Sequence, residues 1–377
     1  MPGAPLVGRL MRILYGVQAT GNGHLSRARA MATAFAARGA DVHYLFSGRE
    51  PSQLFAMQDF HDYRVHRGLS FVSEAGCVRY RKTLLSNHYL RFLQDVRALD
   101  VAHYDVILTD FEPITAWAGR LRGKPVISFG HQPAFDYAVP VADTNLASEL
   151  VMRWFAPGQV RIGLHWARYS PLILPPLIHL SVQEGVRRAG KILVYLPFED
   201  IATVQSLLKH FPAFDFHLYA PGLKAEDRGN LHLRPTSLSG FQADLRDCEG
   251  VICGAGFELA SECLALGKRL LVKPQLRQME QASNALALAE LRLATCMPRL
   301  SHEVVETWLA SNAFAPRVRY PDVASSLADW LLAGDYANES LARLGDDLWR
   351  GVTPDCAVPL RVRPAQRGAP SGAGWAA

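Results

Sequence analysis

The chain has 377 residues, of which 49% are hydrophobic and 20% are charged, and its formal net charge is +5. This length and apolar content are sufficient for two hydrophobic cores, so we expect two domains. The mild positive charge is spread along the chain without a basic stripe, which argues against nucleic acid and fits a small anion or an acidic membrane surface.

The first half of the chain alternates between strand and helix patterns. Strands are predicted at 11–17, 41–46, 105–109 and 125–129, and helices at 26–38, 82–99 and 114–122. Such alternation implies right-handed crossovers and a parallel sheet that is covered on both faces.

The second half repeats this pattern. Strands are predicted at 191–195, 214–220, 231–235, 250–253 and 269–272, and helices at 201–210, 241–247, 257–266, 279–291, 325–332 and 340–349. The fold class is therefore α/β, with two doubly wound Rossmann-like domains that face each other across a cleft.

The predicted limits follow from these patterns. The first domain spans 11–183 and the second 190–335, a helical segment at 336–355 packs back toward the first domain, and 356–377 is a disordered tail rich in Gly, Pro and Ala. Ligands of such sheets bind at the carboxyl ends of the strands.

One glycine turn is the strongest sign of a ligand. Gly254, Ala255, Gly256 and Phe257 follow a short apolar strand and open a helix, whose first backbone N–H groups are then free to bind phosphate oxygens. Glu262, one turn further on, is an acceptor suited to ribose hydroxyls. The alternative is that the glycines only turn the chain and Glu262 is a solvated helix residue.

Polar residues also follow three strands of the first domain. They are Gly21, Asn22, Gly23 and His24 after the first strand, Asp110 and Glu112 after 105–109, and His131 and Gln132 after 125–129. His24 is a candidate general base because an exposed histidine titrates near neutral pH, and it could instead cap its helix or bind a substrate hydroxyl.

The other two carboxylates of this edge have different expectations. Asp110 is a candidate catalytic residue that could instead simply cap a helix, whereas Glu112 is harder to explain as a cap and is the second candidate base. A metal site lacks fixed ligand spacing, so none is predicted. A dinucleotide fingerprint is weak because Ser26 replaces its third glycine and no acidic residue ends the second strand.

Amide side chains gather at the start of the helix at 279–291. Gln278, Gln281 and Asn284 are spaced three apart and suit hydroxyl-rich groups, although a polar solvent face is the alternative. Phe241, at the start of the helix before the glycine turn, could stack on a base or pack in the core.

Together these motifs resemble the donor-binding half of GT-B glycosyltransferases, and most closely the GlcNAc transferase of peptidoglycan lipid synthesis and its relatives. The residues that carry the resemblance are Gly254 to Glu262, Ala265-Leu266-Gly267, Lys273-Pro274, Glu280 to Ala285 and, more loosely, Gly21 to His24 with Asp110 to Pro113 and His131-Gln132, which point to a little-described bacterial and archaeal branch. The likeness covers about residues 11–300.

The resemblance implies a function. The turn at Gly254 to Phe257 would hold a diphosphate, Glu262 the ribose, and Gln281 and its neighbours the sugar, while Phe241 would lie near a uracil. Retaining relatives carry a second glutamate separated from this one by seven residues, and Gly254 stands at that place. We therefore expect an inverting transfer of a UDP-linked, HexNAc-like sugar to a hydroxyl acceptor, without a cofactor.

Two other functions remain open at this stage: a nucleotide-sugar 2-epimerase on the same fold, which would use Asp110 and Glu112, and a non-catalytic nucleotide-sugar-binding protein. We expect a cytoplasmic location. A position at the inner face of the membrane and a lipid-linked acceptor are compatible with this expectation. Residues 152–155 and 166–169 combine aromatic and basic side chains that could touch lipid headgroups or form core helix faces.

Overall fold

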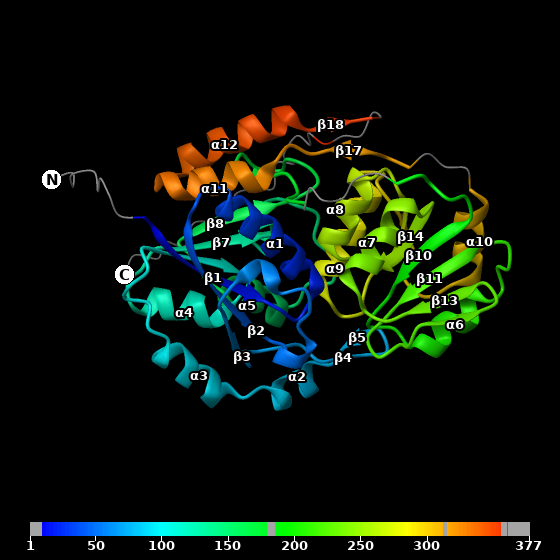
Figure 1. Cartoon of the computed structure of the whole chain (residues 1–377), viewed down its shortest axis with the longest axis horizontal. Helices are drawn as coiled ribbons and strands as arrows, with labels where there is room; N and C mark the ends of the chain where they lie inside the picture. Colours follow the sequence, from blue (N-terminus) through cyan, green and yellow to red (C-terminus); the bar gives the residue numbers. More distant parts are fainter. Residues whose placement is uncertain (1–9, 179–184, 312–314, 356–359, 361–377) are drawn as a thin grey trace.

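A computed structural model describes residues 10–178, 185–311, 315–355 and 360. Two sheets, each covered by helices, divide the chain into two lobes that lie side by side (Figure 1). The predicted α/β class with two doubly wound sheets is confirmed.

The sheet of the first lobe has seven strands, and every neighbouring pair is parallel. In spatial order they are β3 (Tyr63–His66), β2 (Asp41–Ser47), β1 (Arg12–Gln18), β6 (Val106–Asp110), β7 (Val126–Gly130), β8 (Val160–Leu164) and β9 (Ile173–Leu174). Strands β6 and β7 are buried throughout, as expected for a parallel sheet with helices on both faces.

The sheet of the second lobe also has seven strands, of which only the edge strand β12 runs antiparallel. Its order is β12 (Glu226–Arg228), β13 (Leu231–Arg234), β11 (Asp215–Tyr219), β10 (Lys191–Tyr195), β14 (Gly250–Gly254), β15 (Arg269–Lys273) and β16 (Thr295–Cys296). Its helices are α6 (Ile201–Leu208), α7 (Leu238–Asp247), α8 (Phe257–Ala265), α9 (Met279–Glu290) and α10 (His302–Ala310). All five strands predicted for this half are present.

Helices cover both faces of the first sheet. Helix α1 (Asn22–Ala36) packs on one face together with α11 (Val323–Ala333) and α12 (Asn338–Gly351), while α3 (Tyr89–Ala98), α4 (Pro113–Leu121) and α5 (Leu146–Trp154) belong to the other side (Figure 1). Strands β17 (Val318–Arg319) and β18 (Thr353–Pro354) pair beside α12, and short 3-10 helices lie at Pro51–Gln53, Gln58–Phe60 and Gln132–Asp136.

The two late helices contact the first lobe through defined bonds. Arg38 forms an ion pair with Asp329 of α11, and the indole nitrogen of Trp349 on α12 donates to Ile173 O at 2.7 Å. Of the predicted tail only Leu360 is described; it is buried, and its carbonyl accepts a hydrogen bond from Arg168 N. The remaining tail positions and 179–184, at the predicted boundary, lie outside the described residues, so the domain limits remain a prediction.

The prediction of one helix over 82–99 is wrong, because two helices lie there, α2 (Tyr80–Ser86) and α3. Asn87 separates them: its side chain donates to Ser70 O and Thr83 O and accepts from Ser70 N, so it ties the chain to a neighbouring loop. Asparagine often ends a helix in this way, because its side chain offers the backbone an alternative set of bonds.

The glycine segment after β1 also differs from the expectation of a turn followed by a helix from residue 26. Helix α1 already begins at Asn22, with Gly21 as its extended N-cap, so Asn22, Gly23 and His24 form its first turn. His24 is thus held by a helix and not by a loop, which fixes its direction more firmly.

A hairpin extends from the first lobe to the second. Strands β4 (Ser73–Glu74) and β5 (Cys77–Val78) pair, and the turn between them exchanges backbone bonds with the second lobe: Gly76 N donates to Phe198 O, and Leu276 N donates to Gly76 O at 2.7 Å. Gly76 has φ +70°, and a Cβ there would lie 2.1 Å from Glu199 Oε1. Only glycine therefore fits this crossing.

Candidate active site

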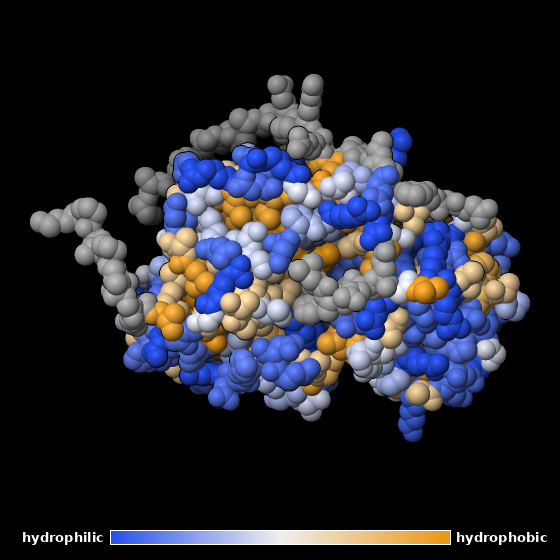
Figure 2. Space-filling model, turned by 45° about the horizontal axis from the view of Figure 1, so that its top comes forward, coloured by the Kyte–Doolittle hydropathy of each residue, from blue (hydrophilic) through white to orange (hydrophobic). Residues whose placement is uncertain are grey.

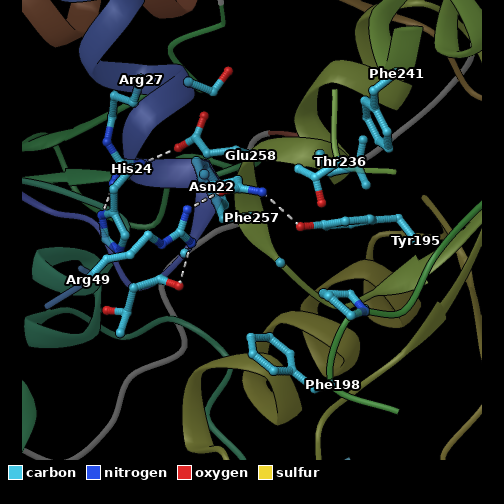
Figure 3. A pocket seen from close by; sticks show the side chains of 18 of the residues that line it. Asn22, His24, Arg27, Arg49, Tyr195, Phe198, Thr236, Phe241, Phe257 and Glu258 are labelled. Atoms are coloured by element: carbon cyan, nitrogen blue, oxygen red, sulfur yellow. Dashed lines mark hydrogen bonds and ion pairs between the residues drawn. The ribbon is translucent and has the colours of Figure 1, made fainter. Parts of the chain in front are cut away.

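A cavity of about 920 Å³ lies between the lobes and is lined by residues of both. The first lobe contributes the start of α1 and the segment after β2, and the second lobe contributes the ends of β10 and β14 and the starts of α7, α8 and α9. Figure 3 shows these groups facing one another across the open space. The predicted position at the carboxyl ends of the strands agrees with this arrangement.

His24 lies in this cavity and is held by a carboxylate behind it. Its Nδ1 atom lies 2.7 Å from Asp110 Oδ1, and Asp110 itself is fully buried and does not line the cavity. Register explains the contact, because β1 and β6 are neighbours and Asp110 pairs with Val17 at the end of β1. The prediction that Asp110 caps a helix is wrong, since it is the partner of His24.

Arg27, one turn further along α1, makes Asp110 the acceptor of three side-chain bonds. Its Nε atom donates to Asp110 Oδ2 at 2.7 Å and its Nη2 atom to Asp110 Oδ1 at 2.6 Å. Its third nitrogen forms a buried ion pair with Glu258 of α8 in the other lobe. One guanidinium therefore connects the His24–Asp110 pair to the helix at the mouth of the second lobe.

The charges of this cluster are set by burial and by Arg27. Burial raises the pKa of Asp110, but the charges and hydrogen bonds of Arg27 and His24 outweigh it and lower that pKa below its ordinary value. For Glu258 burial prevails, aided by the charges of Asp110 and Glu262, and its pKa rises to about 8 despite Arg27. Of the two carboxyl groups that Arg27 contacts, Asp110 is accordingly the one whose ionised form the cluster favours.

Glu112 does not have the expected role. It is the N-cap of α4, where its carboxylate accepts from Ile114 N, Thr115 N, Thr115 Oγ1 and Ser47 Oγ at 2.6–2.9 Å. It is fully buried and lines no part of the cavity, so the prediction of a second base is corrected. Pro113 occupies the first helical position, so Glu112, the residue directly before it, is the N-cap.

The glycine turn before α8 is open toward the cavity. Gly254, Gly256 and Phe257 line it, and a Cβ added to Gly256 would meet nothing within 4 Å. No side chain caps α8, so its first N–H groups remain available to an anion. Ala255 is buried beneath the turn, and its carbonyl accepts from the Asn284 side chain.

Glu262 reaches the cavity one turn later, at the contact between α8 and α1. Ser26 Oγ donates to its Oε1 atom at 2.8 Å, and burial raises the pKa of the carboxyl. Nothing in the described residues donates a hydrogen bond to the other oxygen, Oε2, in addition to this. A hydroxyl-bearing ligand would supply such a donor.

The amides of α9 have separate positions. Gln281 lines the cavity, and its Oε1 atom accepts from Gln275 N. Gln278 is the N-cap of α9, and Asn284 is buried against His131, with 2.5 Å between Asn284 Oδ1 and His131 Nε2; neither of these amides lines the cavity. Of the predicted amide set, only Gln281 can touch a ligand directly.

His131 and Gln132 contribute from the end of β7. Both line the cavity, and Gln132 Nε2 donates to Glu280 Oε2 at 3.1 Å. The His131 ring stacks on Phe257 with 4.3 Å between centroids, and burial lowers its pKa. It therefore packs the end of β7 against the start of α8 at the contact between the lobes.

Aromatic rings form the far end of the cavity in the second lobe. Phe241 lies edge-on to Tyr195 and Tyr219, with ring centroids 5.4 Å and 5.3 Å away, and all three residues line the cavity. Asn22 Nδ2 donates to the Tyr195 hydroxyl at 2.9 Å and so joins the lobes at this end (Figure 3).

Sequence reasoning missed Arg27, Glu258, Tyr195 and Arg49. A signal existed for Arg27, which lies three residues after His24 and so shares its helix face, and for Tyr195, which ends a strand at the carboxyl edge. Glu258 gave none, because a glutamate in a first helical turn is usually solvated. Among the described residues, no group of three or more His, Cys, Asp or Glu is arranged to hold a metal ion.

Residues 166–169, considered above as a lipid contact or a helix face, are neither in the structure. Trp166 is fully buried after β8, and its indole nitrogen donates to Ser261 Oγ of α8 at 2.9 Å. In the described part of the chain, no helix is long and apolar enough to cross a bilayer.

Comparison with known proteins agrees with this architecture. The sequence profile described as "Glycosyl transferase family 1" matches residues 11–312. Similar solved structures include a glycotransferase of kitacinnamycin (TM-score 0.55, 14% identity, 92% of this chain and 100% of that one) and the glycosyltransferase SnogD from Streptomyces nogalater (0.51, 16%, 91% and 96%).

The spinosyn rhamnosyltransferase SpnG is also similar, with a TM-score of 0.51 and 15% identity over 90% of this chain and 96% of that one. A second structure of SpnG, in complex with thymidine diphosphate, has a TM-score of 0.50 and the same identity and coverage. No curated protein matches the chain.

Proposed function

This chain belongs to glycosyl transferase family 1, and we propose that it transfers a sugar from a nucleoside diphosphate sugar to a hydroxyl acceptor with inversion at the anomeric carbon. The observation that carries the proposal is the pairing of two halves of one cavity: an uncapped helix N-terminus beside glycines on one side, and a carboxylate-held histidine on the other.

The donor is proposed to lie along the second lobe. Its diphosphate would meet the N–H groups of α8 beside Gly254 and Gly256, because no side chain occupies that position. Its ribose would donate to Glu262, its base would pack among Phe241, Tyr195 and Tyr219, and its sugar would contact Gln281. We propose uridine as the nucleoside and a HexNAc-like sugar, and the thymidine diphosphate bound by SpnG makes dTDP the first competitor to test.

The proposed reaction uses His24 as the base. With the Nδ1 proton donated to Asp110, the Nε2 atom is free to accept a proton from the acceptor hydroxyl. The hydroxyl oxygen then forms a bond to the anomeric carbon while the bond from that carbon to the diphosphate oxygen breaks. The electron pair leaves with the diphosphate, whose charge the N–H groups of α8 stabilise. Asp110 orients His24 and stabilises the imidazolium that forms.

The epimerase alternative gains no support. The sequence assigned its catalytic carboxylates to Asp110 and Glu112, and both of these are fully buried and line no part of the cavity. A measurement of turnover decides the remaining alternative, because a non-catalytic binding protein would bind a nucleotide sugar without converting it.

We extend the proposal to a lipid-linked acceptor presented at an acidic membrane surface. Helix α2 has no buried residue, and Leu84, Leu85 and Leu90 are 63%, 85% and 79% exposed beside the arginines of α2 and α3. Apolar side chains with a basic surround are typical of interfacial helices. Sedimentation with anionic and neutral vesicles tests this: Leu84→Ser with Leu85→Ser should reduce binding to anionic vesicles, and equal binding by the variant would contradict it.

The central test measures binding and turnover separately. Calorimetric titration with UDP, dTDP, GDP and their sugars should identify one nucleotide that binds, and that sugar nucleotide should be hydrolysed slowly in the absence of an acceptor. His24→Ala should keep the nucleotide affinity and lose most of the turnover. Nucleotide binding with no turnover by the native protein would favour the binding-protein alternative, and full turnover by His24→Ala would place the base elsewhere.

A further inference from the structure

Arg49 is a cation in the cavity wall that no carboxylate neutralises. It follows β2, is partly buried and lines the cavity opposite Phe198 (Figure 3). Its Nη1 atom donates to Asn22 Oδ1 and its Nη2 atom to Thr20 O, both at 2.9 Å. Both acceptors are neutral, so the guanidinium has bonds but no counterion among the described residues.

The other two arginines that line the cavity differ from Arg49 because carboxylate charges act on both of them: Arg29 bonds to the carbonyls of Phe55 and Ala56, but the charges of Asp59 and Glu262 oppose the effect of its burial on its pKa. Arg27 is buried between Asp110 and Glu258, as a buried charge normally requires. Burial lowers the pKa of Arg49, and the only group that opposes this is the Tyr195 phenol. A guanidinium has five N–H groups, and the two bonds to Asn22 and Thr20 use two of them.

The surroundings of Arg49 indicate which ligand would meet it. In the first lobe the same cavity is lined by Ser70, Phe71 and Phe55, while the carboxylates that line it, Glu258, Glu262 and Glu280, all belong to the second lobe. The diphosphate of the donor already has a place at the start of α8. The first lobe is thus the cationic and apolar side of the cleft, and the second lobe is the side with the carboxylates.

We infer that the acceptor carries an anionic group, a carboxylate or a phosphate, and that Arg49 binds it and so orients the hydroxyl toward His24. This inference rests on the proposed function, because it takes the first lobe as the acceptor side. The same guanidinium chemistry would serve the donor diphosphate, so the experiment separates the two sources. Charge-assisted, forked bonds to an oxyanion are the usual role of an arginine with free N–H groups.

The experiment uses two phenols that differ only in charge, 4-hydroxyphenylacetate and 4-hydroxyphenylacetamide, together with phenyl phosphate. Each is titrated by ligand-observed NMR into the full chain with saturating UDP, and again without nucleotide. The native protein should bind both anions at least about tenfold more tightly than the amide with UDP present, because a hydrogen bond to a charged group typically contributes that much. Arg49→Gln should abolish the preference, and Arg49→Lys should restore part of it.

Arg343→Gln is the matched control, since it removes one positive charge from an exposed position on α12. It should keep the preference. No preference for the anions in the native protein, or a preference that Arg49→Gln retains, would overturn the inference. If UDP displaces the bound anions, or if Arg49→Gln loses affinity for UDP, Arg49 would be assigned to the donor diphosphate instead. If the native chain binds the anions but binds no nucleotide, the proposed function would be refuted, whereas the anion site at Arg49 would stand.

Discussion

Replacement of Asp110 by asparagine tests the central cluster most directly. The substitution keeps the shape of the side chain and removes the charge that accepts three bonds, one from His24 at 2.7 Å and two from Arg27 at 2.7 Å and 2.6 Å. It leaves His24 without an ionised partner and Arg27 with Glu258 alone. We therefore expect Asp110→Asn to lower both the turnover rate and the free energy of unfolding.

The magnitudes follow from the geometry. General-base catalysis is typically worth about 10²–10⁴-fold, so an imidazole with the wrong tautomer or orientation should cost about 10²–10³ in kcat. Breaking a buried ion pair costs about 3–5 kcal/mol, and because Glu258 still faces Arg27 we expect about 3 kcal/mol. At roughly 2–4 °C per kcal/mol, the melting temperature should fall by about 6–12 °C.

The assay is release of the nucleoside diphosphate from its sugar, measured well below the melting temperature, with nucleotide affinity measured in parallel. Glu112→Gln is the matched control, because Glu112 is equally buried and also accepts several hydrogen bonds but lies outside the cavity. It should lose stability and keep kcat. A native rate in Asp110→Asn, or an equal loss of kcat in both variants, would refute the role of the His24–Asp110 pair.

Three further predictions concern the second lobe and the glycines. Gly256→Val should leave the melting temperature nearly unchanged, since a Cβ added there would meet nothing within 4 Å, and it should weaken nucleotide binding at least about tenfold. Gly16→Ala should instead destabilise the fold, because the added Cβ would lie 2.0 Å from Thr115 Oγ1. Equal melting temperatures of the two variants would contradict this. Glu262→Gln should reduce UDP affinity more than dTDP affinity in calorimetry, because only a ribose offers the 2′-hydroxyl, and an equal loss for both would remove the ribose role. Burial raises the pKa of Glu258 to about 8 in the folded state, above the ordinary value for a glutamate, so between about pH 5 and 8 the folded state holds a proton that the unfolded state has lost. The free energy of unfolding should therefore decrease as pH rises through this range. In Glu258→Gln, the free energy of unfolding measured by chemical denaturation should decrease less with rising pH than in the native protein. An identical pH dependence in the two proteins would show that Glu258 does not titrate in this range.

The sequence was informative where local pattern determines structure. The glycine turn before α8, the strands of both sheets and the convergence of His24 with Asp110 at neighbouring strand ends all follow from spacing and from the rule that parallel strands share a carboxyl edge. The division of one predicted helix into α2 and α3 did not follow, because it depends on bonds from Asn87 to a loop 17 residues earlier.

The roles of the carboxylates depended on contacts that no local pattern contains. Asp110 and Glu112 are two residues apart, yet one binds His24 and the other caps α4, because Thr109 and Pro113 direct the backbone between them and Phe111 has φ +55°. Glu258 meets Arg27 across 231 positions of sequence. Such a pair becomes visible only when the two lobes are placed together.

The contact between the lobes would link donor binding to the proposed base. Arg27 belongs to α1 yet bonds to Glu258 of α8, and Ser26 next to it bonds to Glu262, so two adjacent residues of the first lobe hold two carboxylates at the mouth of the second. Gly23 permits this approach, because a Cβ there would lie 3.0 Å from Glu258 Cγ. A ribose that bonds to Glu262 would therefore act on the helix that also positions His24. In the proposed mechanism, donor binding and orientation of the base would share one interface, and an alteration at either carboxylate should affect both.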